Sequence, residues 1–393
     1  MILKDICVQD RKIVYPCSLE SANLPYLGLE QIESQTGRIL SDRPTGDSSA
    51  GIGAAFRFDS RHVLYSKLRP YLNKVALPEH EGRCSTELIP LLPSAGIERD
   101  FLGFLLRSPS AVAHASSANT GARMPRADME HLFSWEVEVP TIKVQRRIAS
   151  RLKEQMTAVE QARQQVLDQI RHAEILRLKY FRDAFDESAL AEWDARALLD
   201  IAHIVSGMTL GGPVAQEPTT KVPYLRVANV KDGWLMLEDV KEIDATERDI
   251  EQFQLRHGDV VLTEGGDPDK LGRGTVWREE ISLCLHQNHI FRVRFDHAQV
   301  CPEFAAYQFA SRYGKAYFLA HAKQTTGIAS INKGVLSRFP FRLPPLATQR
   351  HIAARLRGQF EHLQQLKSAL TDQLAALDHL PGAYLREAFG NFQ

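Results

Sequence analysis

The feature that most constrains this chain is an internal repeat. Residues 140–185 recur at residues 344–389 without a gap, at a shift of 204 positions (344 − 140 = 204). Identical dipeptides coincide at three points: Gln145-Arg146 with Gln349-Arg350, Ile148-Ala149 with Ile352-Ala353, and Arg151-Leu152 with Arg355-Leu356. A repeat of this length constrains the architecture before any local prediction is made.

Each copy of the repeat predicts a long helix. Apolar residues recur at alternating spacings of three and four, which makes a seam that must pack on another helix, and the other copy is the simplest partner. About 40 residues of helix rise roughly 60 Å. The predicted coiled-coil seam consists of Leu152, Met156, Val159, Val166, Ile170, Leu356, Phe360, Leu363, Leu370 and Leu374.

Two details of the seam carry separate predictions. Arg163 and Lys367 occupy the same place in the two copies, and a polar residue inside a seam commonly fixes the register. Pro381-Gly382 does not favour a regular helix, so we expect the second helix to end or bend early. A heptad stripe alone indicates packing, so function must lie in what the helices connect.

The segments before each helix read as strand-rich mixed domains. In the first, alternating runs bounded by Gly and Pro predict strands near residues 25–32, 63–69, 86–92 and 133–139, with helices near 100–106 and 110–118. Residues 195–343 repeat this plan more loosely, with strands near 222–230, 257–263, 289–293 and 339–343. Residues 186–198 read as a linker. The chain therefore reads domain, helix, domain, helix.

Composition narrows the class of protein. The 393 residues carry no net charge, which argues against a globally basic nucleic-acid coat and leaves room for a local basic face. We expect no signal peptide and no membrane span, because no basic start leads into a long apolar run. The five cysteines lack metal-ligand spacing and are typical of a reducing cytoplasm.

Catalytic motifs are missing from the sequence. It holds no phosphate-binding loop, no dinucleotide fingerprint, no nucleophile elbow, and no amino-methyltransferase signature. Asp267, Asp269 and Lys270, in a Gly-rich stretch, mimic part of a nuclease site, but the stretch reads better as a loop between strands. The scattered histidines form no metal set. We therefore predict no catalytic residue and no metal site in this chain.

The two domains do offer side chains suited to DNA. Arg pairs with guanine, and Asn or Gln with adenine, while Lys and Arg also hold phosphates. Any one such residue is ordinarily a solvated surface residue, so the grouping at strand ends and loops carries the prediction. The candidate DNA-binding residues are Lys67, Arg69, Tyr71, Asn73, Lys74 and Arg123 in the first domain, and Arg226, Asn229, Lys231, Lys270, Arg273, Gln287, Asn288, Lys323 and Gln324 in the second.

With these features together, the chain resembles a specificity subunit of a type I restriction–modification system. The resemblance covers nearly the whole chain. Its motifs are Thr326-Gly327-Ile328-Ala329-Ser330-Ile331-Asn332, the segment from Leu343-Pro344-Pro345-Leu346 to Ile352-Ala353, and the closing Arg386-Glu387-Ala388-Phe389-Gly390. The first copy departs from the motif, since Thr141 replaces the second Pro.

The resemblance implies an α+β fold in which two pseudo-repeated target recognition domains are separated by helices that pair as an antiparallel coiled coil. The expected parts are target recognition domain 1 (1–140), spacer helix 1 (141–186), a linker (187–198), target recognition domain 2 (199–344) and spacer helix 2 (345–390). Each domain would read one half of a bipartite double-stranded DNA target, and the helices would set the spacing.

The resemblance also implies partners and cofactors. Modification subunits would dock on the helices, carry S-adenosylmethionine and methylate adenine, and restriction subunits would use ATP and Mg²⁺. This chain would hold no cofactor itself. Two other readings stay open: an autonomous nuclease or methyltransferase, which the missing motifs oppose, and a coiled-coil scaffold that does not bind DNA, which an acidic face on both domains would favour.

Overall fold

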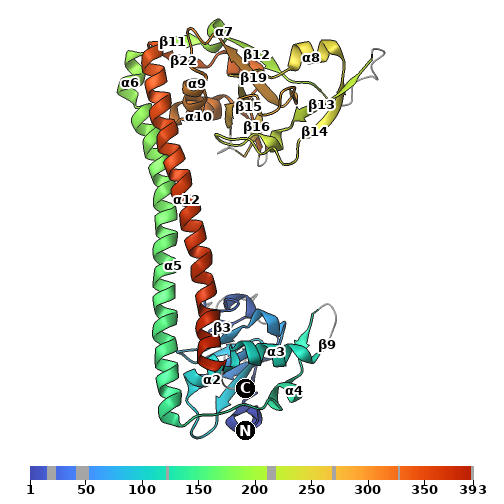
Figure 1. Ribbon diagram of the computed structural model, residues 1–393, viewed down its shortest axis with the longest axis vertical. Coiled ribbons are helices and arrows are strands. Elements are labelled where there is room, and N and C mark those ends of the chain that lie inside the picture. The colour runs from blue at the N-terminus through green and yellow to red at the C-terminus, as the bar shows by residue number, and fades with distance from the viewer. Residues whose placement is uncertain are drawn as a thin grey trace. The chain divides into compact units, whose positions relative to one another are not determined.

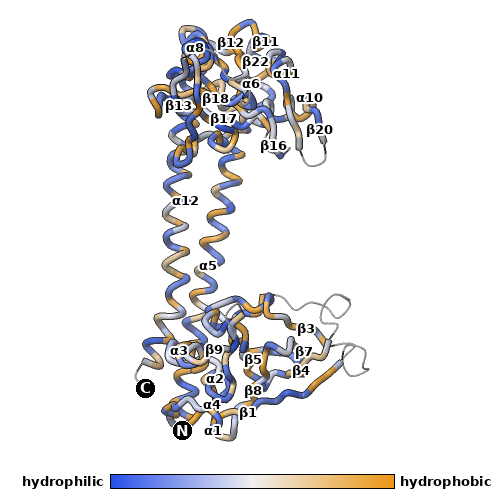
Figure 2. The backbone as a smooth tube through the Cα atoms, turned by 90° about the vertical axis from the view of Figure 1, so that its right-hand side faces the viewer, coloured by the Kyte–Doolittle hydropathy of each residue, from blue (hydrophilic) through white to orange (hydrophobic). Residues whose placement is uncertain are grey.

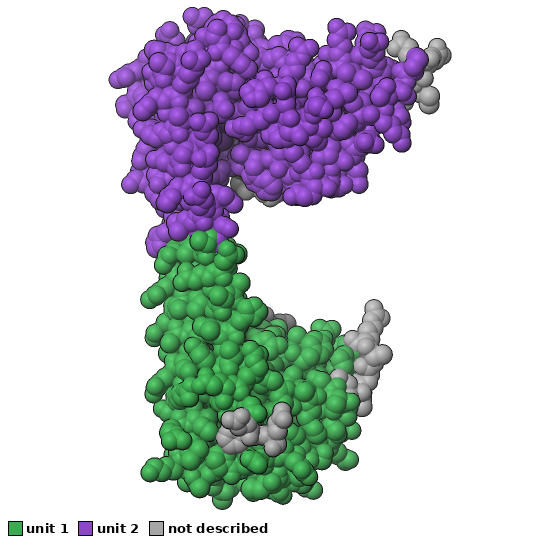
Figure 3. Space-filling view, viewed as in Figure 1, with its two compact units in different colours: residues 1–169, 369–393 green, residues 170–368 purple. Residues whose placement is uncertain are grey.

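The computed structural model describes residues 1–15, 24–40, 53–120, 124–209, 218–267, 271–325 and 328–390. The chain divides into two compact units, shown in Figure 3: unit 1 holds residues 1–169 and 369–393, and unit 2 holds residues 170–368. Each unit therefore combines one globular head with a part of both long helices.

The head of unit 1 is built from short elements. In chain order they are α1 (Leu3–Ile6), β1 (Cys7–Gln9), β2 (Ile13–Val14), β3 (Tyr26–Leu27), η1 (Leu29–Gln31), β4 (Ala55–Phe58), β5 (Val63–Ser66), η2 (Pro70–Leu72), β6 (Val75–Ala76), β7 (Gly82–Cys84), β8 (Leu88–Pro93), α2 (Arg99–Leu106), α3 (Pro109–Ser117), β9 (Asn119–Thr120), β10 (Arg126–Ala127) and α4 (Met129–Phe133). One sheet has the order β1-β8-β5-β6, and another has the order β2-β4-β7-β3.

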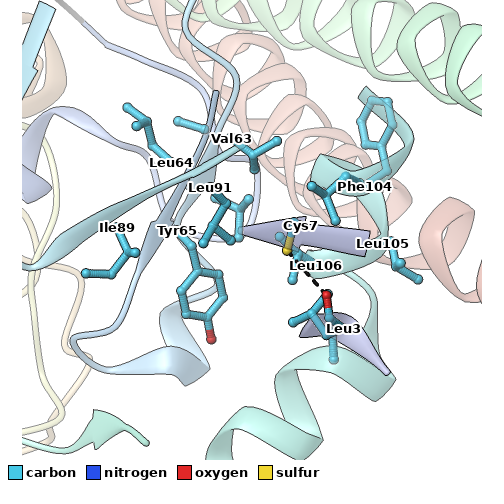
Figure 4. Packing of buried hydrophobic residues seen from close by; sticks show 14 of the residues in the cluster. Leu3, Cys7, Val63, Leu64, Tyr65, Ile89, Leu91, Phe104, Leu105 and Leu106 are labelled. Carbon is cyan, nitrogen blue, oxygen red and sulfur yellow. Dashed lines mark hydrogen bonds between the residues drawn. The ribbon is translucent and has the colours of Figure 1, made fainter. Parts of the chain in front are cut away.

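The core of unit 1 lies between its central sheet and α2. All four residues of β5 are buried, as the centre of a sheet covered by a helix requires. Figure 4 shows Val63 and Leu91 lying toward Phe104 and Leu106 of α2, and all four belong to one hydrophobic cluster. The helix α2 begins here because the Glu98 carboxylate accepts a hydrogen bond from the Phe101 amide at 2.6 Å.

The head of unit 2 follows the same plan with longer elements. They are α6 (Glu187–Glu192), β11 (Asp194–Ala197), α7 (Leu198–Ile201), β12 (Ala202–Ser206), β13 (Thr220–Leu225), η3 (Val227–Asn229), β14 (Lys241–Ala245), α8 (Glu247–Phe253), β15 (Val260–Thr263), β16 (Gly265–Gly266), β17 (Gly274–Val276), β18 (Leu285–His286), β19 (Ile290–Phe295), α9 (Pro302–Ala310), α10 (Arg312–His321), β20 (Lys323–Thr325), β21 (Ile328–Ser330), α11 (Lys333–Ser337) and β22 (Pro340–Leu343).

The two heads share their strand order. The central sheet of unit 2 runs β12-β19-β15-β17, which matches β1-β8-β5-β6 strand for strand in sequence order. A parallel pair recurs as well, because β3 lies parallel to β7 in unit 1 and β13 lies parallel to β18 in unit 2. The loosely repeated sequences of the domains thus fold to the same topology.

The long helices are α5 (Ile142–Ala184) and α12 (Leu346–Phe389). A buried glutamine anchors each helix in its first turn. The Gln145 amide accepts from Glu98 N at 2.8 Å and donates to Gly96 O and Pro140 O. The Gln349 amide makes the same three bonds, with Cys301 N, Gln299 O and Pro344 O. This explains why the repeat keeps a Gln five residues after its Pro.

The helices pair within each unit as an antiparallel coiled coil. The predicted seam residues are buried at Leu152, Val159, Val166, Leu356, Leu363 and Leu370, and half-buried at Met156, Ile170, Phe360 and Leu374. Figure 2 shows hydrophobic and hydrophilic stretches alternating along both helices. In the part of the chain that the structure describes, no helix is apolar enough over a sufficient length to cross a membrane.

Two cross-helix ion pairs obey the same repeat as the sequence. In unit 1, Arg163 Nε lies 2.6 Å from an Asp378 oxygen, and in unit 2, Lys367 Nζ lies 3.1 Å from a Glu174 oxygen. Lys367 is Arg163 shifted by 204 positions, and Asp378 is Glu174 shifted by the same number. The seam cations predicted from the sequence therefore each face a carboxylate of the opposite helix.

The second helix was predicted to end or bend early at Pro381, and the ending is wrong, since α12 continues through it to Phe389. Proline removes one backbone hydrogen bond, which packing can offset. Here Leu385 and Phe389 are 2% and 1% exposed and belong to the core of unit 1. Burial of these two side chains holds the last turns of the helix in place.

Other local predictions are also corrected. Residues 133–139 form no regular strand: α4 ends at Phe133, and Glu136 makes a single bridge to Ile2, because the short N-terminal segment offers little to pair with. The segment 187–198 is not a plain linker, since it forms α6 and β11, and β11 pairs with β22. The runs at 25–32 and 222–230 pass from a strand into the 3-10 turns η1 and η3.

Candidate nucleic-acid interface

A hairpin is attached to the central sheet of unit 1. Its strands β9 and β10 pair antiparallel, and Figure 1 shows β9 at the edge of the unit. The Ala127 amide donates to Lys67 O at 2.8 Å, and the Arg69 amide donates to Pro125 O at 2.7 Å. The hairpin is therefore hydrogen-bonded to the residues that directly follow β5. The first group of candidate DNA-binding residues lies in this segment.

Unit 2 has the equivalent hairpin, β20–β21, which pairs with β16 directly after β15. The Ile331 amide donates to Glu264 O at 2.9 Å. Lys323 and Gln324 lie exposed on β20, where they are free to meet a partner. Both heads thus carry a two-stranded ribbon at the same place.

Three candidate DNA-binding residues of unit 1 are at least partly exposed beside the β9–β10 hairpin. Arg69 is exposed, and its positive φ of 50° turns the chain sharply into η2. Tyr71 within η2 is 48% exposed. Tyrosine is enriched at interfaces, because its ring is apolar and its hydroxyl is polar. Lys67 is half-buried, with its Nζ 3.8 Å from a Glu87 oxygen.

The fold itself uses Asn73 and Lys74. Asn73 is 8% exposed, and its Nδ2 donates to Arg107 O at 2.9 Å. Lys74 Nζ donates to Leu29 O at 2.7 Å, and burial lowers the pKa of this ammonium below its usual range. Asn73 is thus buried and Lys74 half-buried, and both hold the head together, while their DNA contact stays an untested prediction.

The second head uses Asn229 in the same structural way. Asn229 is 1% exposed, accepts from Arg226 N at 2.8 Å, and donates to Met236 O and Asp239 O. It stands where Gln31 caps η1 in the first head. Asn229 therefore has a structural role in this chain, and its predicted base contact stays untested.

The remaining candidates of unit 2 differ in their availability. Arg226 pairs with Asp239 at 2.8 Å, and hydrogen bonds from Lys241 and then Arg226 hold the pKa of the Asp239 carboxyl below its usual range. Gln287 accepts from Val227 N at 3.3 Å. Lys231, Arg273 and Asn288 are half-buried.

Some predicted positions lie outside the described residues: Arg123, Lys270, and Thr326-Gly327 of the motif. Within the described ranges, no group of three His, Cys, Asp or Glu side chains is placed to hold a metal ion. His286 is buried and bonds Ile290 O through Nδ1, so it belongs to the core of its head.

Comparison with known proteins shows what this chain is similar to. The model of the type I restriction modification DNA specificity domain matches residues 191–376. The type I restriction enzyme StySPI specificity subunit of Salmonella potsdam is 21% identical over 314 residues, which are 76% of this chain and 66% of that protein. The EcoDI specificity subunit of Escherichia coli is 26% identical over 183 residues, 45% of this chain and 39% of that protein. The chain is thus similar to the specificity subunits of type I restriction–modification systems.

Solved structures show the same fold. The HsdS subunit from Thermoanaerobacter tengcongensis superposes with a TM-score of 0.62 at 20% identity, over 99% of this chain and 95% of that one. A chain from a study of complex assembly and conformational transition of the type I R-M system gives a TM-score of 0.75 at 20% identity, over 99% and 96%. The curated relatives are matched over about two thirds of their length or less.

Sequence reasoning missed four ionisable side chains: Glu87, Arg126, Glu264 and His289. They lie where each hairpin joins its sheet, at backbone positions that correspond between the heads. The shift that aligns Arg126 with Ser330 is again 204 positions, so the repeat contained a signal for this one position. Glu264 corresponds to Lys67 at a shift of 197 and His289 to Glu87 at a shift of 202, and only the strand register reveals these two matches.

Proposed function

We propose that this chain recognises double-stranded DNA by sequence, with each head reading one half of a bipartite target. The observation that carries the proposal is the repeated head, in which the same sheet order supports the same hairpin. Two-stranded β-ribbons fit the major groove, where base edges differ. Arg69, Lys323 and Gln324 are exposed at these hairpins and suit that purpose.

The paired helices, in this proposal, set the spacing between the half-sites. A continuous helix is a stiff spacer of about 1.5 Å per residue. Both helices begin at a glutamine held by three hydrogen bonds, so each head is joined firmly to the helix that follows it. This supports a fixed rather than a flexible connection.

The chemistry comes from partners. Modification subunits that carry S-adenosylmethionine and methylate adenine dock on the helices, and restriction subunits with ATP and Mg²⁺ complete the enzyme. Two neighbouring apolar residues on α5 support such docking: Ile175 is 61% exposed and Leu178 is 68% exposed, although soluble helices ordinarily bury such side chains. The chain itself contributes recognition and holds no cofactor.

A binding selection tests the proposal. The complex with its modification subunits is incubated with random duplex DNA at about 0.15 M salt, where nonspecific phosphate binding is weakened. We expect enrichment of one motif with two short constant blocks and a spacer of constant length. Sequences that remain random after several rounds would refute DNA specificity and leave the scaffold interpretation.

A further inference from the structure

The joint between hairpin and sheet has the same backbone wiring in both heads. In unit 1, the Lys67 amide donates to Glu87 O at 3.0 Å, while Lys67 O accepts from Ala127 N. In unit 2, the Glu264 amide donates to His289 O at 2.9 Å, while Glu264 O accepts from Ile331 N. Lys67 therefore corresponds to Glu264, and Glu87 to His289.

The third position of the joint follows from the hairpin strands. Arg126 precedes Ala127 in β10, and Ser330, the last residue of β21, precedes Ile331. Each of three positions in unit 1 thus has an equivalent position in unit 2, defined relative to the sheet of its own head. We call these two sets of residues joint 1, comprising Lys67, Glu87 and Arg126, and joint 2, comprising Glu264, His289 and Ser330.

Joint 1 presents an oriented arginine. Arg126 Nε and Nη2 donate to the Glu87 carboxylate at 3.1 and 3.0 Å, and Lys67 Nζ lies 3.8 Å from the same carboxylate. The Arg126 side chain is 43% exposed. The carboxylate occupies one edge of the guanidinium, and among the described residues Nη1 has no hydrogen-bond partner. A second edge with two N–H donors therefore faces outward.

Joint 2 carries the carboxylate and the nitrogen base at exchanged positions. His289 Nδ1 lies 2.6 Å from Glu264 Oε2, with the carboxylate now at the place that Lys67 holds in the first head. The Glu264 side chain is 30% exposed and that of His289 is 57% exposed. Ser330 replaces the arginine. Joint 2 therefore offers the acceptor oxygens of Glu264, at the position of Lys67, and lacks the donor edge of joint 1.

Stability of the fold does not require this inversion. Exposed ion pairs contribute little to folding, and the backbone hydrogen bonds of the joint are the same in both heads whichever side chains stand there. Two heads that recognise different bases need different side chains at matched, solvent-accessible positions, and the joints meet this requirement. A carboxylate that orients an arginine also reduces the conformational entropy lost on binding.

We propose that the joints are specificity-determining sites: joint 1 reads a guanine, and joint 2 reads a base that presents an exocyclic amino group in the major groove. Guanine offers N7 and O6, which accept two N–H donors of an arginine. Cytosine N4 and adenine N6 donate to a carboxylate such as Glu264. The inference rests on the proposed function, since it assigns base contacts to heads that bind DNA.

An exchange of the joints tests this assignment. A triple variant carries Lys67→Glu, Glu87→His and Arg126→Ser in the first head, and its motif is read by the same binding selection in complex with the modification subunits. We expect the guanine at one position of one half-site to be lost or replaced, with the other half-site and the spacer unchanged. The preference for guanine at that position should fall at least tenfold.

A second variant keeps the test decisive if the triple variant folds poorly. Arg126→Lys retains the charge but loses the fork of N–H donors, so we expect a relaxed preference at the same base. Arg61→Ser is the matched control, because Arg61 also binds a carboxylate through two nitrogens, that of Asp59, and is 71% exposed in the same head.

The outcomes separate clearly. An unchanged motif, or a uniform loss of affinity for all sequences, overturns the assignment, because phosphate contacts weaken binding without altering preference. Loss of the guanine preference in the Arg61→Ser control overturns it too. If the parent complex itself shows no sequence preference, then the proposed function fails, and that result is distinct from failure of the joints.

Discussion

Gln145 and Gln349 show how one residue type determines where a long helix starts. Each glutamine is almost fully buried and satisfies one backbone amide and two carbonyls that would otherwise lack partners. We expect Gln145→Ala to lower the free energy of unfolding by about 1–3 kcal/mol, since buried polar groups lose their partners. Urea unfolding measures this, with the exposed Gln161→Ala as control. Equal stability of both variants would contradict the role.

His286 provides a test by pH. Burial lowers the pKa of this imidazole from 6.5 to about 3. The unfolded chain therefore binds a proton below pH 6.5 that the folded chain does not accept until pH is near 3. The contribution of this imidazole to the free energy of unfolding is therefore fully present above the unfolded pKa. It is lost as the pH falls toward the folded pKa, by up to about 1.4 kcal/mol per pH unit.

The variant His286→Leu should remove this part of the pH dependence. Urea midpoints measured between pH 7 and 4.5 should decline less steeply for the variant than for the parent chain, whereas the exposed control His351→Leu should follow the parent. Parallel curves for parent and His286→Leu would show that the buried imidazole does not titrate as we infer.

At the scale of elements, the paired helices depend on their buried leucines. Leu363 and Leu370 are 5% and 4% exposed in the seam. We expect Leu363→Asp or Leu370→Asp to destabilise its unit by at least about 3 kcal/mol, because a buried carboxylate without a partner is costly. Thermal unfolding measures the loss, and Gln365→Asp on the exposed face is the control. Melting temperatures equal to that of the control would contradict the assignment of these leucines to the seam.

Elements differed in how well their sequence predicted them. The seam followed from heptad spacing because a helix forms its own hydrogen bonds, and the spacing alone says which face is buried. Strand ends depend on partners distant in the chain, so residues 133–139 looked like a strand although Ile2 offers Glu136 a single bridge. The helix end expected at Pro381 failed for a related reason, since Leu385 and Phe389 beyond it pack in the core of unit 1.

The candidate interface was harder to predict than the fold. Exposed polar side chains such as Lys323 and buried ones such as Asn229 look alike in sequence, because burial is decided by the sheet around them. The hairpin joints were invisible for the same reason. Lys67 and Glu264 correspond only through the backbone bonds to Ala127 and Ile331, which no single offset in the sequence reveals.

At the scale of the whole molecule, the proposed ruler predicts a change in spacing. A heptad inserted into α5 after residue 169 and another into α12 after residue 368 keep the seam in phase. Each adds about 10 Å of helix, so the spacer between half-sites should grow by about three base pairs. A heptad in α5 alone serves as control and should disrupt assembly. An unchanged spacer with matched insertions would refute the ruler.

The measurement that tests the account most directly is a map of methylated bases in DNA from cells that make this chain with the proposed modification subunit. Two heads of one topology predict a bipartite motif, with a methylated adenine in each half and a spacer of constant length. A single contiguous motif, or methylation without any sequence preference, would contradict the claim that the two heads read two separate half-sites.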